Sequence, residues 1–143
     1  MIWRPLRTAV RESRFSRARK DFHTKRERLE AKFVRLASTR AKPGAPRWAD
    51  CEFEDDVAYV RNRTTGELSA FVEIVMMIDG APRDGEALDD PTGTAQAGTA
   101  IFRFDGQHWD TDGRAFLNLS PAEAIRYYKD DLEIVGQELA GRS

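Results

Sequence analysis

The residues best suited to metal chemistry lie between His108 and Gly113. In an extended strand, His108, Asp110 and Asp112 would share one face, as the ligands of a metal ion do. The spacing also partly matches the start of an EF-hand calcium loop, with acids at positions 3 and 5 and glycine at position 6. However, position 1 is then a histidine, and position 12 is Leu119, which has no ligand atom. We therefore interpret the segment as a polar strand ending in an Asp-Gly turn, and expect no metal site and no cofactor.

Catalytic groups are not indicated elsewhere in the chain. Adjacent carboxylates occur at three places, Asp55-Asp56, Asp89-Asp90 and Asp130-Asp131. Acid–base catalysis needs two carboxyl groups in one cleft, but neighbouring side chains in a strand or helix point apart. The single cysteine, Cys51, lies in an alternating segment typical of a small core residue, and nothing in the sequence brings His23 or His108 to it. No phosphate-loop, dinucleotide or hydrolase motif occurs, so we expect no catalytic residues and favour a protein that is not an enzyme.

Charge is divided unevenly along the chain. Residues 1–47 hold 15 Lys and Arg against four Asp and Glu, whereas residues 48–143 hold eight against 20. Such asymmetry indicates an acidic, nucleic-acid or membrane partner, and it also allows the two parts to attract each other. The candidate partner-binding residues are Arg14, Arg17, Arg19, Lys20, Lys25, Arg28, Lys32 and Arg35. An acidic protein surface, a second copy of the chain and nucleic acid all remain open, although no pattern of base-stacking aromatics is present.

Aromatic residues offer an alternative, a small-molecule or enzymatic site. An antiparallel sheet that curves around a helix can leave a cone open at one end, and this architecture loosely resembles cystatin-like and related cone folds. The candidate pocket residues are Trp48, Tyr59, Phe71, Trp109 and Phe116. The long loop over 79–98 could act as a lid on such a pocket. The same aromatic side chains would also suit a plain hydrophobic core.

The basic residues belong to a predicted helix over 13–41. Neither proline nor glycine occurs between Leu6 and Lys42, and apolar residues recur at three-, four- and seven-residue steps. This narrow stripe comprises Phe15, Ala18, Phe22, Leu29, Phe33 and Leu36. We expect a disordered tail at 1–12 and a linker at 42–47, where proline and glycine end the helix. A fragment starting at Arg47 is then expected to fold without the helix but to lose the partner.

The rest of the domain, 48–143, shows the period-2 alternation of strands. The segments are 48–53, 57–63, 67–78, 99–104, 107–111 and 115–119. Asp-Gly dipeptides at 105–106 and 112–113 predict tight hairpin turns. Ser120, Pro121 and Glu123 form a capping box that predicts a helix start, and an apolar face continues to Leu139. We therefore expect one α+β domain, with a long N-terminal helix, a mostly antiparallel meander of five or six strands, and an amphipathic C-terminal helix packed on the sheet.

Three short stretches carry a resemblance. The residues RWADCEFEDD at 47–56, FRFDG at 102–106 and TDGR at 111–114 are similar to short bacterial proteins without an assigned activity. The resemblance covers most of the chain after about Ser16, implies a bacterial cytoplasmic origin, and carries no functional residues. The start is rich in arginine and lacks the continuous apolar stretch of a secretory signal, although it also suits an organellar transit peptide. The longest apolar run, 74–78, is too short to cross a bilayer, so we expect a cytoplasmic protein without a membrane partner.

Overall fold

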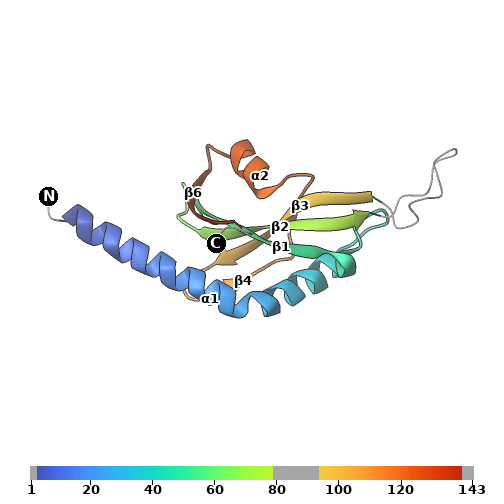
Figure 1. Cartoon of the computed structure of the whole chain (residues 1–143), viewed down its shortest axis with the longest axis horizontal. Helices are drawn as coiled ribbons and strands as arrows, with labels where there is room; N and C mark the ends of the chain where they lie inside the picture. Colours follow the sequence, from blue (N-terminus) through green and yellow to red (C-terminus); the bar gives the residue numbers. More distant parts are fainter. Residues whose placement is uncertain (1–2, 79–93, 140–143) are drawn as a thin grey trace.

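The computed structural model describes residues 3–78 and 94–139, and it confirms the expected α+β class (Figure 1). The helices are α1 (Trp3–Thr39), the short 3₁₀ helix η1 (Trp48–Asp50) and α2 (Pro121–Tyr127). The strands are β1 (Glu52–Asn62), β2 (Leu68–Ile78), β3 (Thr94–Phe104), β4 (Trp109–Asp110), β5 (Ala115–Leu117) and β6 (Leu132–Glu138). Every strand pairing is antiparallel, in the order β4-β3-β2-β1-β6, with β5 also pairing with β3.

Helix α1 lies along one face of the sheet and α2 lies on the other (Figure 1). The apolar stripe of α1 enters the larger of two hydrophobic clusters, in which Phe22 and Phe33 are fully buried. The ring of Phe22 lies 4.9 Å from that of Trp109, and the Trp109 Nε1 donates a hydrogen bond of 2.8 Å to the carbonyl of Ala18. Because the stripe supplies so many fully buried side chains, α1 is part of the core.

Helix α1 also begins earlier than the sequence predicts. Its backbone is helical from Trp3, so most of the expected tail at 1–12 belongs to the helix, while residues 1–2 lie outside the described chain. Pro5 is compatible with this start because the first four N–H groups of a helix have no intrahelical partner in any case. The helix ends at Thr39, two residues before the predicted end.

The predicted C-terminal helix is correct at its start but wrong in its length. Ser120 Oγ accepts a hydrogen bond from the Glu123 N–H, and the Glu123 carboxylate accepts one from the Ser120 N–H, as a capping box requires. Helix α2 then ends at Tyr127, and residues 132–138 form β6 on the free edge of β1. Pairing with β1 satisfies backbone groups that a longer helix would have satisfied internally, and Gly136 disfavours a helix here.

Gly136 also explains how α1 passes so close to β6. A Cβ atom at this position would lie 2.6 Å from the Phe15 ring, so a larger residue would displace that ring. The predicted strand boundaries shift as well. The segment 48–53 is η1 followed by the start of β1, and β3 begins at Thr94 rather than at residue 99. Residues 79–93 of the predicted lid lie outside the described chain.

Candidate anion-binding surface

Over residues 13–39, the cations of α1 divide into those whose side chains pair with carboxylates and those whose side chains do not. Two of the paired cations reach carboxylates at the edges of the sheet. Lys32 Nζ lies 2.6 Å from Asp110, and Arg19 Nε lies 3.6 Å from Glu138. The hydrogen bond from Lys32 also lowers the pKa of the Asp110 carboxyl. These ion pairs link α1 to the sheet, and the carboxylates offset the positive charge that a partner could otherwise contact.

The second group has no such carboxylate partner among the described residues, and we call it the outer ridge. It comprises Arg14, Arg17, Lys20, Arg28 and Arg35, all exposed. Within the described part of the chain, none of the five side chains makes a hydrogen bond or an ion pair. At about 100° per residue they fall within a sector of roughly 120°, whose middle lies about 130° from the middle of the apolar stripe, with Arg14 nearest to the stripe. From Arg14 to Arg35 the ridge is about 31 Å long.

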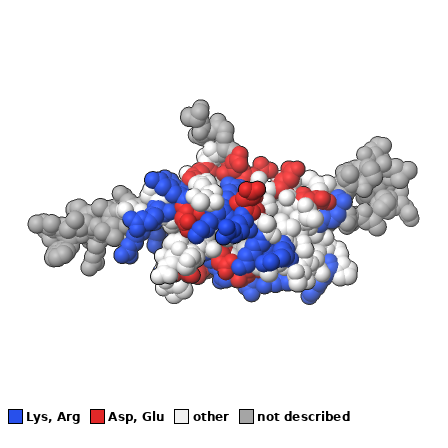
Figure 2. Space-filling view, turned by 90° about the horizontal axis from the view of Figure 1, so that it is seen from below, with Lys and Arg blue, Asp and Glu red and all other residues white. Residues whose placement is uncertain are grey.

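Figure 2, which views the molecule from the side of α1, shows blue side chains gathered over this face. Two acidic residues lie near the ridge. Asp21 is paired with Lys25, on the same helix, at 3.4 Å, and Glu27 lies at the border of the sector. The outer ridge therefore carries a clear excess of positive charge.

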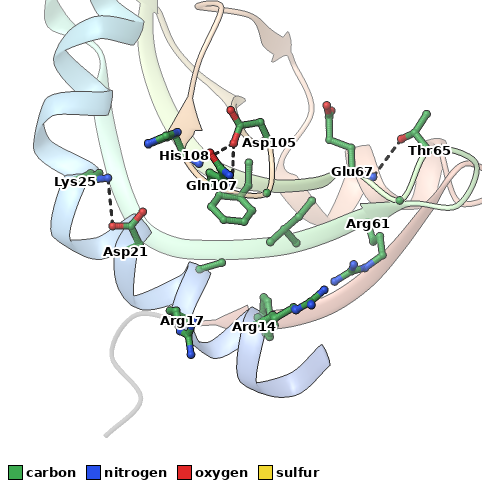
Figure 3. A pocket seen from close by; sticks show the side chains of 16 residues that line it. Arg14, Arg17, Asp21, Lys25, Arg61, Thr65, Glu67, Asp105, Gln107 and His108 are labelled. Carbon is green, nitrogen blue, oxygen red and sulfur yellow. Dashed lines mark hydrogen bonds and ion pairs between the residues drawn. The ribbon is translucent and has the colours of Figure 1, made fainter. Parts of the chain in front are cut away.

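A cleft of about 1130 Å³ lies at the end of the sheet, between the N-terminal half of α1 and two hairpin turns (Figure 3). One turn joins β1 to β2 and supplies Thr65 and Glu67, and the other joins β3 to β4 and supplies Asp105 and His108. Apolar side chains that line the cleft are Phe15, Ala18, Leu68 and Phe104. The cleft is open to solvent and contiguous with the outer ridge, because Arg14 and Arg17 belong to both.

Most of the carboxylates in this cleft are already engaged. Asp105 accepts hydrogen bonds from the N–H groups of Gln107 and His108, at 2.8 and 2.7 Å, which shape the turn and lower the pKa of its carboxyl. Asp21 is engaged with Lys25. By contrast, Arg61 on β1 makes no ion pair or hydrogen bond through its side chain with any described residue. Among the described residues of the cleft, cationic side chains without a partner therefore outnumber carboxylates without a partner.

The five aromatic candidates for a pocket do not come together around one cavity. Trp48, Tyr59 and Trp109 are buried in the cluster beneath α1. Phe71 and Phe116 pack against each other on the opposite face of the sheet, with ring centroids 5.6 Å apart. None of the five lines the cleft, and Trp48 borders a separate, shallower hollow of about 410 Å³.

The other sequence candidates are also occupied. Asp110 pairs with Lys32, and Asp112 pairs with Arg103, so the acids after His108 hold α1 and β3 in place. Among the described residues there is no group of three or more His, Cys, Asp or Glu that could hold a metal ion. Burial, aided by the nearby charges of Glu30 and Glu52, raises the pKa of the Cys51 thiol to about 12. Asp89 and Asp90 lie outside the described residues.

Arg61 is the residue of the cleft that sequence reasoning missed. In β1 the side chains alternate, so Val57 and Tyr59 face α1 while Ala58 and Val60 face α2. Arg61 continues the first set and therefore lies on the α1 face, at the end of the strand. The alternation was available in the sequence, but the approach of α1 to this end of the sheet was not.

No protein family model matches the chain, and comparisons with curated proteins and with solved structures find no match. None of the described helices is long and apolar enough to cross a membrane. The functional argument therefore depends on the geometry and charge of the chain itself.

Proposed function

We propose that this protein is a non-enzymatic module that binds nucleic acid. The phosphate backbone of the nucleic acid lies along the outer ridge of α1. The carrying observation is the row of five exposed cations without a partner among the described residues. Four of them are arginines, whose planar guanidinium groups suit phosphate oxygens. Each phosphate that such a residue neutralises releases condensed counterions, which supplies the affinity. The proposal includes a bacterial cytoplasmic location.

The composition of the ridge favours nucleic acid over an acidic protein or a second copy. Protein interfaces usually contain a buried apolar or aromatic centre inside a polar rim. The exposed large apolar side chains of the described chain are Leu117, Tyr127, Ile134 and Leu139, and none lies on residues 13–39 of α1. A surface with a clear excess of cations suits a partner that presents regularly spaced negative charge.

The first experiment measures binding and its dependence on salt. A fluorescently labelled 20-nucleotide DNA, single-stranded or duplex, is titrated with the protein from 50 to 200 mM salt while anisotropy is recorded. Four to five phosphate contacts predict a log–log slope of about −4 on duplex DNA, or roughly a 250-fold loss of affinity over this range. Absent binding, or binding that does not respond to salt, contradicts the proposal. In that case, an acidic protein is the next candidate partner to test.

The second experiment locates the contact surface. Replacing Arg17 and Arg28 with glutamine removes two ridge cations, and we expect the slope to become shallower by about 2 and the affinity at 0.1 M salt to fall roughly 50-fold. The matched control replaces Arg126 and Lys129 with glutamine as well. These are two exposed cations near α2, on the opposite face of the sheet. The control makes the same change in net charge and is expected to leave binding nearly unchanged. Equal losses in the two variants would show that overall charge, not the ridge, is responsible.

A further inference from the structure

Two arginine side chains from different elements extend toward one another in the cleft. Arg14 comes from α1 and Arg61 from the end of β1, and Figure 3 shows their guanidinium groups directed at each other from opposite walls. Like charges repel, so such an arrangement is normally stabilised by a carboxylate placed between them. Among the described residues, no carboxylate pairs with either arginine.

The carboxylates nearest to this pair are directed elsewhere. Glu67 lines the cleft, but its carboxylate points away from Arg61 in Figure 3. Glu133 lies opposite Arg61 on β6, and its carboxylate is 3.8 Å from Arg63 instead. The two guanidinium groups therefore leave a place for an anion that no carboxylate of the described residues fills.

We propose that this end of the cleft binds a phosphate monoester, held between Arg14 and Arg61. A dianionic phosphate monoester has three terminal oxygens, one more than a carboxylate. It can therefore accept paired N–H hydrogen bonds from more than one guanidinium group. Arg17 and Thr65 line the same cleft, but in Figure 3 the Arg17 side chain points away from the pair and the Thr65 hydroxyl accepts a hydrogen bond from the Glu67 N–H. The apolar side chains of Phe15, Leu68 and Phe104 line the same cleft and can contact an uncharged part of the ligand.

This site is separate from the nucleic-acid proposal in one testable respect. Arg61 belongs to the sheet and is not part of the outer ridge, so a change there affects the cleft without altering the exposed face of α1. The phosphate monoester could belong to a free nucleotide or to the phosphorylated end of a nucleic-acid strand. Both present the same group, and the experiments below distinguish them.

The direct test is titration of the full-length protein with adenosine 5′-monophosphate, inorganic phosphate and adenosine, followed by amide NMR shifts at constant ionic strength. We expect saturable shifts in the cleft with the first two ligands and none with adenosine. Arg61→Gln should weaken binding at least tenfold, whereas Arg126→Gln should not. If Arg61→Gln does not fold, Arg14→Gln serves as the second variant. Absent shifts, equal binding of adenosine, or binding unaffected by these substitutions would overturn the proposal.

The source of the phosphate is identified with two oligonucleotides of one sequence, one with a 5′-phosphate and one with a 5′-hydroxyl. A preference for the phosphorylated strand that Arg61→Gln abolishes identifies a strand end as the ligand. Equal affinity for both strands, together with nucleotide binding that depends on Arg61, identifies the free nucleotide. If Arg28→Gln with Arg35→Gln removes strand binding but leaves nucleotide binding intact, the cleft acts independently of the ridge.

Discussion

The thiol of Cys51 is kept out of its reactive form by its surroundings. Burial and the charges of Glu30 and Glu52 raise its pKa from 9.0 to about 12. The thiolate is the nucleophile, so three pKa units reduce the reactive fraction near neutral pH by about a thousandfold. We expect a disulfide reagent such as Ellman's to label the native protein several hundredfold more slowly than the guanidinium-unfolded protein at pH 7.4. A native rate within tenfold of the unfolded rate would contradict this account.

Neighbouring groups also shift the pKa of Glu73, which lies on β2. Partial burial, together with the charges of Asp56, Glu54 and Glu123, raises the pKa of its carboxyl above 4.5. The folded state then holds this proton more tightly than the unfolded state, so the stability contribution falls as pH rises through the folded pKa.

The predicted effect of Glu73→Gln is a higher melting temperature at pH 7, and no gain below about pH 4, where the carboxyl is protonated in both states. Thermal unfolding followed by circular dichroism at several pH values measures this. Glu27→Gln is the control, because Glu27 is exposed on α1. A gain from Glu73→Gln that persists unchanged at acidic pH would show that its cause is packing and not charge.

Individual side chains were harder to predict from the sequence than their elements. The capping residues Ser120 and Glu123 were readable because their interaction is local. The pairing of Lys32 with Asp110, at 2.6 Å, joins residues far apart in the chain. Sequence spacing cannot distinguish such a paired cation from an exposed one such as Arg35. The eight predicted basic contacts therefore separated into ridge residues and edge residues only when the sheet was in place.

At the scale of elements, the turn between β4 and β5 is fitted against α1. Gly113 has a φ of +75°, and a Cβ atom there would lie 2.7 Å from the Cβ of Leu36 and 2.8 Å from the Ala37 nitrogen. Gly106, in the turn between β3 and β4, also has a positive φ of +104°, but it has open space around it. The two glycines thus share the backbone requirement and differ in the contact with α1.

We expect Gly106→Ala to cost about 1 kcal/mol, from the left-handed conformation alone. Gly113→Ala should cost at least about 2 kcal/mol more, because the methyl group must displace the backbone of α1. Urea unfolding of both variants measures the difference. Equal costs would indicate that α1 yields to the turn without penalty.

The elements themselves were predicted well where the signal was local. The long helix, the hairpins β1–β2 and β3–β4 and the start of α2 all followed from periodicity or turn residues. The hairpin predicted at Asp112-Gly113 is wrong, because β4 and β5 both pair with β3 and not with each other. The segment after α2 was misread because the three-residue spacing of Leu132 and Val135 fits one face of a helix, whereas in β6 these residues join clusters on opposite faces of the sheet. Residues 132–138 form a strand because pairing with β1 covers backbone groups at its edge that would otherwise be exposed.

At the scale of the whole molecule, α1 serves both the core and the surface. Its buried side chains are Ala18, Phe22, Leu29, Phe33 and Ala37. Loss of a single buried phenylalanine typically costs 3 to 5 kcal/mol, whereas a domain is stable by only about 5 to 15 kcal/mol. The sequence suggested a separable helix, because the change of charge and the change of periodicity coincide near the 42–47 linker. The packing of α1 gives the opposite expectation.

We predict that a fragment of residues 47–143 does not fold alone, because removing α1 exposes Trp109, Phe102 and Tyr59 together. Its amide NMR spectrum should show poor dispersion. Adding a peptide of residues 13–41 should restore the native pattern, since the same burial is then available between two chains. A matched peptide carrying Phe22→Ala and Phe33→Ala should not restore it. A fragment that is well dispersed by itself would mean that the sheet and α2 suffice, and that α1 contributes the charged surface alone.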